Sequence, residues 1–229
     1  MQTRGLLYEE MNKMRRELSV MAARVKEDLG KALTILRSGR GVLSKDDLSG
    51  HNLLDEIKES GEIVDGLQLK IEDMALVLIA TQQPVARDLR ELVTVFKITA
   101  SLERIGDYGI HLAKAARKLS VRPSFRSIER IERMAETSQE MLNAAFAAYL
   151  MQDADAAREA AAMDVAIDTE HKALTEEVLA LMKEKPGLVK AAARLLKLSG
   201  YMERLGDHVT NICEGIIYIS EGRHEELNR

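Results

Sequence analysis

Apolar residues recur at helical spacing along most of the chain, with charged positions between them. The first such segment runs from Leu6 to Leu36 and is broken by a Gly-rich stretch at residues 38–41. A second segment runs from about Ser44 to Gln82, and the stretch Gly41–Asn52 at its start is expected to be irregular. These patterns predict amphipathic helices that are long enough to line a bundle.

All three prolines fall where a helix is expected to begin, because the first helical turn tolerates a residue without an N–H. Pro84 precedes the third segment, Pro123 the fourth and Pro186 the sixth. The second half of the chain is then expected to hold helices that end near residue 151, span 153–183 and span 187–220. The sequence therefore predicts an all-α fold of six helices.

A five-residue motif occurs twice, one hundred positions apart, as Glu103-Arg104-Ile105-Gly106-Asp107 and Glu203-Arg204-Leu205-Gly206-Asp207. Over the eleven residues that end at each Asp, five are identical and five are conservative exchanges, which indicates an internal duplication. We therefore expect two tandem three-helix bundles, residues 1–120 and 121–229, related by internal pseudo-symmetry.

The motif places two carboxylates one helical turn apart, about 6 Å along the axis, where their oxygens can converge on one metal ion. It also works against its own helix, since a mid-helix Gly costs about 1 kcal/mol relative to Ala. Two interpretations of both copies remain open. Either the acids form a metal site beside the Gly, or the Gly permits close helix packing.

Composition agrees with packed helices, because only 3% of the residues are aromatic and there is no Trp. The net charge of −4 and the absence of a Lys/Arg block argue against nucleic-acid binding. Residues 1–19 lack a signal-peptide core and the longest apolar stretch, 74–80, is too short to span a bilayer, so a cytoplasmic location is expected. The single cysteine, Cys213, is expected to be a buried, inert thiol.

Three segments of the chain resemble signature segments of the PhoU family, the cytoplasmic regulators that accompany phosphate ABC transporters. The first two are Gln82–Arg90 and Lys97–Asp107, and the third is Glu203–Glu214. The resemblance covers essentially the whole chain. It implies a fold of two tandem three-helix bundles, and some members hold multinuclear iron or other metal clusters on Glu/Asp-x-x-x-Asp pairs.

The ligands that this resemblance implies are carboxylates in both halves of the chain. They are Asp65, Glu103 and Asp107 in the first half, and Asp164, Asp168, Glu203 and Asp207 in the second. Carboxylate oxygens suit iron, manganese, magnesium or calcium, and zinc also stays open. The identity of the metal is not specified by the sequence.

The first half departs from the implied pattern. Gly61 stands four residues before Asp65, where an acid is expected, with Glu62 beside it. His111 stands where the second half has Asn211, and it is either a nitrogen ligand or a histidine at the rim of the site. If metals bind, we therefore expect the site of the second half to be the better formed.

Other polar residues carry weaker signals. Arg87, Asp88 and Arg90 open the third helix, either as solvated charges near its N-terminus or as a contact for a partner or an anion. His208 is expected to pack rather than to bind metal, because it points about 100° away from the acids. His171 has no supporting constellation.

The resemblance implies a non-enzymatic negative regulator of phosphate uptake and of the phosphate-starvation two-component response. It would link the phosphate ABC transporter to a sensor histidine kinase, as a homo-oligomer such as a dimer, and meet the membrane only through its partners. Two alternatives stay open, a metal-free helical adaptor and a carboxylate-bridged di-metal enzyme. The enzyme signature is Glu-x-x-His, and neither Glu103 nor Glu203 has a His three residues on.

Overall fold

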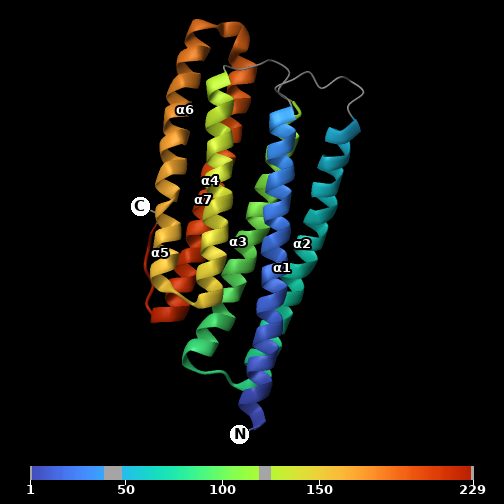
Figure 1. Cartoon of the computed structure of the whole chain (residues 1–229), viewed down its shortest axis with the longest axis vertical. Helices are drawn as coiled ribbons and strands as arrows, with labels where there is room; N and C mark the ends of the chain where they lie inside the picture. Colours follow the sequence, from blue (N-terminus) through green and yellow to red (C-terminus); the bar gives the residue numbers. More distant parts are fainter. Residues whose placement is uncertain (1, 39–47, 119–124, 228–229) are drawn as a thin grey trace.

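The computed structural model describes residues 2–38, 48–118 and 125–227, and within these ranges it contains helices and no strand, as predicted (Figure 1). The helices of the first half are α1 (Gln2–Ser38), α2 (Leu48–Gln82) and α3 (Ala86–Ala116). Those of the second half are α4 (Phe125–Met151), α5 (Ala154–Ala162), α6 (Asp164–Glu184), the 3-10 turn η1 (Pro186–Leu188) and α7 (Val189–Glu221). The all-α fold class is therefore confirmed.

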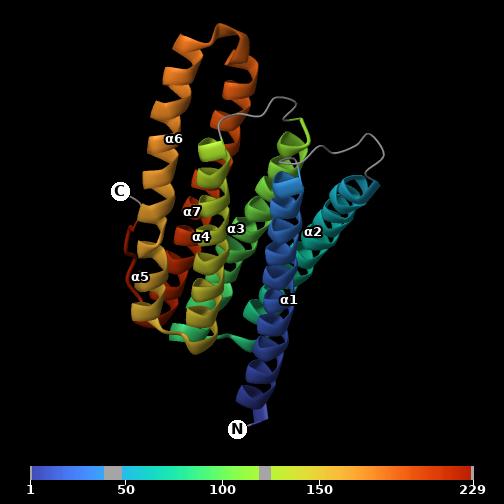
Figure 2. The same ribbon diagram turned by 45° about the horizontal axis from the view of Figure 1, so that its top comes forward.

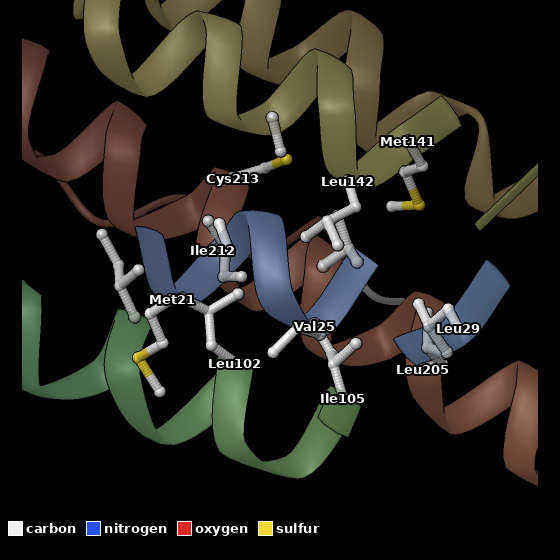
Figure 3. Close-up of a cluster of buried hydrophobic side chains, with 14 of the residues drawn as sticks. Met21, Val25, Leu29, Leu102, Ile105, Met141, Leu142, Leu205, Ile212 and Cys213 are labelled. Atoms are coloured by element: carbon white, nitrogen blue, oxygen red, sulfur yellow. The ribbon is translucent and has the colours of Figure 1, made fainter. Parts of the chain in front are cut away.

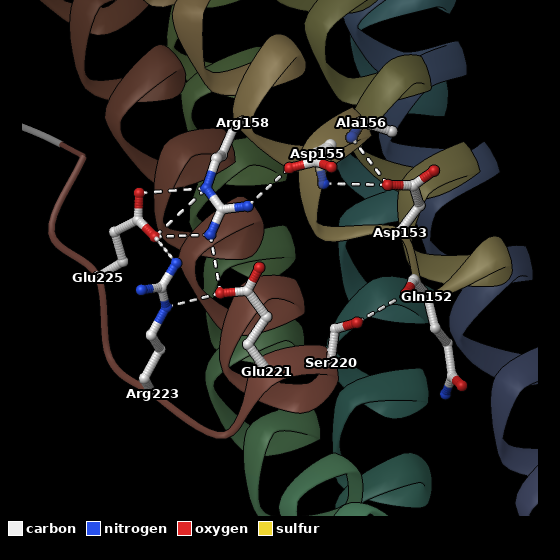
Figure 4. Close-up of polar contacts among 9 residues, drawn as sticks. All are labelled: Gln152, Asp153, Asp155, Ala156, Arg158, Ser220, Glu221, Arg223 and Glu225. Carbon is white, nitrogen blue, oxygen red and sulfur yellow. Dashed lines mark hydrogen bonds and ion pairs between the residues drawn. The ribbon is translucent and has the colours of Figure 1, made fainter.

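The fifth predicted helix is broken into α5 and α6. Met163 keeps helical angles (φ −66°, ψ −22°), but its amide donates to Ala160 O and Ala166 N donates to Met163 O, so both bonds span three residues instead of four. Asp153 caps the start of α5, since its side chain accepts from the amides of Asp155 and Ala156 (Figure 4). The sequence gives no Gly or Pro at this break.

Two other expectations need correction or lie outside the description. The stretch 48–52 is the helical start of α2, so the expectation of an irregular Gly41–Asn52 is wrong there, and residues 41–47 lie outside the described ranges. Pro123 and the boundary at residues 120 and 121 also lie outside them, so the division of the chain into 1–120 and 121–229 stays a prediction. Pro186 opens η1 rather than α7 itself.

The helices form two three-helix groups that share one long axis (Figures 1 and 2). In the first group α1, α2 and α3 contact one another, and in the second α4 and α7 pack with the broken arm of α5 and α6. The motif helices α3 and α7 lie side by side and join the two groups. This arrangement confirms the tandem three-helix bundles.

One hydrophobic core runs through both groups (Figure 3). Buried side chains from four helices meet in it, including Met21 and Val25 of α1, Leu102 of α3, Met141 of α4 and Ile212 of α7. Cys213 is fully buried in this core, and burial raises the pKa of its thiol to about 12, so it stays protonated and unreactive at neutral pH.

A buried carboxylate ties the groups together near the start of α3. Glu91 is 1% exposed and accepts two hydrogen bonds of 2.6 Å from the guanidinium of Arg15. It also accepts from the Tyr149 hydroxyl at 3.0 Å and from the Gln152 amide at 2.9 Å. The carboxylate of Glu91 therefore has hydrogen-bond partners from both groups of helices.

Arg90 donates to the carbonyl of Ile219 at 2.9 Å and thus caps α7, which gives it a structural role.

None of the helices in the described ranges combines the length and low charge that a bilayer-spanning helix requires.

Candidate metal centre

Each motif lies on a central helix and faces one neighbouring helix of its own group. In the first half α2 packs against α3 and brings Asp65 toward Glu103 and Asp107. In the second half α6 packs against α7 and brings Asp164 and Asp168 toward Glu203 and Asp207. The structure therefore brings the predicted residues of each half together.

The four acids of the second half line one pocket of about 570 Å³. Arg158 of α5 and Leu227 of the C-terminal segment also line it. Arg158 binds Glu221 at 2.9 Å and Glu225 at 2.8 Å, so the C-terminal segment is fastened along α5 beside the pocket (Figure 4). The arginine is therefore held by other carboxylates at the edge of the acidic cluster.

Asp164 is the most buried of these acids, with 8% of its surface exposed. Its Oδ1 is buried without a hydrogen-bond partner, and its Oδ2 accepts only a long 3.4 Å bond from Thr210 Oγ1. Burial, followed by the charges of Asp168 and Asp207, raises the pKa of Asp164 to about 7. A buried polar atom without a partner requires an explanation, and a bound cation or a proton would provide one.

The motif glycine of the second half leaves room for this carboxylate. A Cβ on Gly206 would lie 2.0 Å from Asp164 Oδ1 and 3.1 Å from Ile167 Cδ1, and contacts below 3.0 Å do not occur in folded proteins. The space beside α7 is thus filled by an acid of α6 in place of a side chain. The close-packing interpretation holds here, since the glycine permits a close approach by a carboxylate, and the metal-site interpretation stays a prediction.

Glu203 and Asp207 are held close to like charges. Burial and then the neighbouring carboxylates, Asp207 for Glu203 and Asp168 for Asp207, raise the pKa of both groups. A fully ionised cluster would repel itself, and a divalent cation is the partner that relieves this repulsion. The donor set of oxygens fits a hard cation such as magnesium, calcium or manganese, and also iron.

The carboxylates of this pocket do not already form a metal-coordination geometry. Across residues 2–38, 48–118 and 125–227, no group of three or more His, Cys, Asp or Glu side chains is arranged to hold a metal ion as it stands. Binding would therefore require rotation of carboxylates in this pocket, and the ligand set stays a prediction.

In the first half an arginine of the motif lies close to both motif acids. Arg104 Nε lies 3.3 Å from Glu103 Oε2 and its Nη1 lies 3.7 Å from Asp107 Oδ2. Burial and then Asp107 raise the pKa of Glu103, while Arg104 opposes this shift. Asp65 is exposed on α2. This site thus carries three acids and an arginine that already contacts two of them.

The missing acid of the first half is replaced by an apolar contact. A Cβ on Gly61 would lie 3.0 Å from Ile110 Cδ1. In the repeat, Ile110 stands at the position of Thr210 and Gly61 at that of Asp164, so an acid and its hydroxyl donor in the second half correspond to a glycine and an isoleucine in the first. Glu62 is exposed, and nothing in the structure brings it toward Glu103.

Three histidines lie near the motif helices. His111 is exposed and stacks on Tyr201 with ring centroids 5.1 Å apart, which matches the rim interpretation. His208 packs against Tyr108 at 5.8 Å, as expected. Sequence reasoning missed His171, whose charge acts on Glu203 and whose Nδ1 lies 2.6 Å from Ser199 Oγ. Its signal was its place seven residues after Asp164 and three after Asp168, on the same face of one helix.

The sequence of this chain is similar to those of one protein family. The PhoU domain family model matches residues 18–116 and 131–216. The chain is 30% identical to the phosphate-specific transport system accessory protein PhoU homolog of Clostridium acetobutylicum, over 99% of both chains. It is 27% identical to PhoU homolog 1 of Thermotoga maritima, over 94% of this chain and 89% of the relative.

Two crystal structures share the fold. PhoU from Pseudomonas aeruginosa superposes with a TM-score of 0.84 at 27% identity, over 94% of this chain and 99% of that one. The phosphate transport system regulatory protein PhoU from Streptococcus pneumoniae superposes with a TM-score of 0.83 at 25% identity, over 96% and 99% of the two chains.

Proposed function

Since the chain belongs to the PhoU family, we propose that it is an accessory protein of a phosphate-specific transport system and regulates phosphate transport. The observation that supports this most is the extent of the likeness, which spans nearly the whole chain and both copies of the motif. The relatives are named as accessory and regulatory proteins, and these names support the proposal of a non-enzymatic role for this chain.

The finer proposal is that the protein acts in the cytoplasm as a negative regulator of phosphate uptake and of the phosphate-starvation response. It would contact the transporter and a sensor histidine kinase and so carry the state of one to the other. Deletion of the gene is expected to raise the expression of phosphate-scavenging genes in phosphate-replete cells. An unchanged response on deletion would count against the regulatory role.

The partner contacts can be tested with purified components. Surface-immobilised protein is expected to bind the ATPase subunit of the transporter and, separately, the kinase. A control chain with Lys172→Ala, an exchange at an exposed position of α6 outside the acidic motifs, tests the specificity of the readout. If neither partner binds the wild-type chain, the linking role is contradicted.

The two groups of acids are proposed as cation sites. Asp164, Asp168, Glu203 and Asp207 would hold a metal in the second half, with Asp65, Glu103 and Asp107 as a weaker site in the first. Support comes from the orphaned Oδ1 of Asp164 and from the space that Gly206 leaves for it. A bound cation would supply positive charge that stabilises the deprotonated acids and holds α6 against α7.

Metal analysis separates the proposal from its two alternatives. Protein prepared with iron, manganese, zinc, magnesium or calcium is expected to retain metal, and Glu203→Ala with Asp207→Ala is expected to retain less of it. A metal-free adaptor would retain none. A di-metal enzyme would retain metal and also turn over a substrate, although the motifs lack the Glu-x-x-His pairs of that class.

We also propose that the protein is a homodimer. Exposed large apolar side chains on α2, namely Leu69, Leu76 and Val77, provide a surface that a second copy would cover. Sedimentation equilibrium is expected to give twice the chain mass of 25.5 kDa. A concentration-independent monomer would contradict this part of the proposal.

A further inference from the structure

A second cleft, of about 790 Å³, lies between the two motif helices, and none of the proposed metal ligands lines it. Polar groups of both halves line it: Lys97, Ser101 and Arg104 of α3, and His208 and Asn211 of α7. Tyr218 and the C-terminal segment also line it. Its volume falls in the range of about 300 to 1,000 Å³ that is usual for small-molecule sites.

Lys97 is an unpaired cation in this cleft. It is exposed, and among the described residues no carboxylate lies within ion-pair distance of its ammonium. Its counterpart in the second half, Lys197, does not line the cleft and instead lies over the ring of Tyr201, 5.6 Å from the centroid. The repeat thus provides a matched lysine that differs from Lys97 in its surroundings.

His208 presents an unsatisfied ring to the same place. Its Nδ1 is buried without a partner, which leaves Nε2 as the nitrogen that can reach a ligand in the cleft. An N–H buried without a partner is rarer than an unpaired acceptor, so the proton belongs on Nε2, where it can donate to a ligand.

Arg104 adds a second permanent charge. Its contacts with Glu103 at 3.3 Å and Asp107 at 3.7 Å are long, and its side chain is 59% exposed. Pairs of this kind contribute little in water, so a ligand can recruit the guanidinium at small cost. Arg104, Lys97 and His208 are therefore three donors that line the same cleft.

The acids that line the cleft are mostly engaged elsewhere. Glu214 accepts from the amide of Leu227 at 2.8 Å, and Glu225 binds Arg158 at 2.8 Å. Glu226 is exposed and lies in the C-terminal segment, as does His224, whose ring stacks on Tyr218 with centroids 4.1 Å apart. The cleft is thus cationic at the end near Arg104 and aromatic at the end near Tyr218.

We propose that this cleft binds a phosphorylated small molecule of about mononucleotide size. Its phosphate would contact Lys97, Arg104 and His208, with Asn211 and Ser101 as neutral donors, and its ring would lie toward Tyr218 and His224. Charged donors of this kind are the usual partners of phosphate oxygens. The site shares Arg104 with the acids of the first half but none of the proposed metal ligands, and the proposal does not depend on bound metal or on the regulatory role.

Isothermal titration calorimetry with ADP tests it, using the full chain in low salt with EDTA so that the acidic pockets hold no divalent cation. ADP is expected to bind saturably with one site per chain, and adenosine, which lacks the phosphate, is expected not to bind. Inorganic phosphate is expected to bind more weakly than ADP, because it leaves the aromatic end of the cleft empty.

Matched variants locate the site. Lys97→Ala is expected to weaken ADP binding by about tenfold or more, the effect of one lost hydrogen bond between charged groups, whereas Lys197→Ala should leave it within about twofold, because that side chain lies outside the cleft. Both lysines are on the surface, and thermal melting checks that each variant is folded.

Each outcome supports or overturns a stated part of the proposed site. Binding of phosphate as tight as that of ADP, lost in Lys97→Ala, would support the cationic end and overturn the aromatic end. Absence of binding of both ADP and phosphate at millimolar concentration would overturn the proposal and leave the cleft as a surface for a protein partner. Equal losses in Lys97→Ala and Lys197→Ala would also overturn it, because they would reflect net charge alone.

Discussion

The two copies of the Glu-Arg-(Ile/Leu)-Gly-Asp motif have nearly the same sequence but different surroundings. A Cβ on Gly206 would lie 2.0 Å from a buried carboxylate of α6. A Cβ on Gly106 would meet only Val25 at 3.7 Å and Val64 at 3.9 Å, which are ordinary van der Waals distances. The same glycine therefore makes room for an acid in one half and merely packs against apolar side chains in the other.

The difference arises on the neighbouring helix, outside the motif. Asp164 and Thr210 in the second half correspond to Gly61 and Ile110 in the first, and this exchange replaces a buried acid with an apolar contact. The first half also has Arg104 within 3.3 to 3.7 Å of both motif acids. The motif of two carboxylates thus forms the better candidate cation site in the half where the facing helix supplies additional acids.

The largest expected effect concerns the buried acid itself. The folded-state pKa of Asp164 is raised from 3.8 to about 7, so the folded protein retains a proton that the unfolded chain loses in this interval. Stability without divalent cations should therefore fall as pH rises from about 4 to 7, by on the order of 2 to 4 kcal/mol. Asp164→Asn should remove most of this loss, as urea unfolding at pH 5 and pH 8 would measure.

The matched control for this prediction is Glu103→Gln in the first half, whose effect on the pH dependence should be much smaller because Arg104 opposes its pKa shift. A wild-type pH slope that persists in Asp164→Asn would contradict the assignment of the buried charge.

Transfer of the second-half pair into the first half is expected to have the next largest effect. Gly61→Asp alone should clash with Ile110 and bury an unpaired acid, at a cost of about 1 to 3 kcal/mol in the free energy of unfolding. Adding Ile110→Thr should recover part of this cost by providing a hydroxyl donor. Chemical denaturation of the single and double variants tests the coupling, and strictly additive effects would show that the two positions do not act as a pair.

The glycines should respond in opposite directions to the same exchange. Gly106→Ala should stabilise the protein by roughly 0.5 to 1 kcal/mol, because Ala is the better helix former and the space is open. Gly206→Ala should destabilise it by about 1 kcal/mol, since displacement of Asp164 and contact with Ile167 outweigh the gain in helix propensity. Thermal unfolding of both variants measures this, and equal shifts of the same sign would contradict it.

The smallest effect is expected for the arginines. Arg104→Ala should lower stability by less than about 0.5 kcal/mol, because its pairs with Glu103 and Asp107 are long and exposed. Arg204→Ala should have an effect no larger. A loss above 1 kcal/mol in Arg104→Ala alone would mean that this side chain holds the first site together more strongly than its geometry indicates.

Most of the fold followed from local patterns in the chain. Apolar spacing predicted the long helices, and the repeated motif predicted that α3 and α7 are equivalent members of two bundles. The break at Met163 was not predictable, because the hydrogen-bond shift there occurs in a stretch of good helix formers without Gly or Pro. The helical start of α2 at Leu48 was missed for the opposite reason, since Gly50 and Asn52 reduce local helix propensity.

The sequence indicated which acids would lie close together, but not how deeply they are buried or how their charges are balanced. Spacing and resemblance indicated which acids would meet, and Gly61 already indicated that the halves are unequal. That Asp164 fills the space beside Gly206 depends on how closely α6 approaches α7, which the sequence does not encode locally. The pairing of Arg158 with Glu221 and Glu225 joins residues more than sixty positions apart and likewise emerges only from tertiary packing.

The most direct test of the central claim is a calorimetric titration with Mn²⁺ on matched double variants at pH 7.5. Asp164→Asn with Asp207→Asn is expected to weaken the tightest binding by about tenfold or more, because two of four carboxylates lose their charge. Glu103→Gln with Asp107→Asn is expected to leave that binding nearly unchanged. If the first-half variant loses the tightest binding and the second-half variant retains it, the account of the two sites is contradicted.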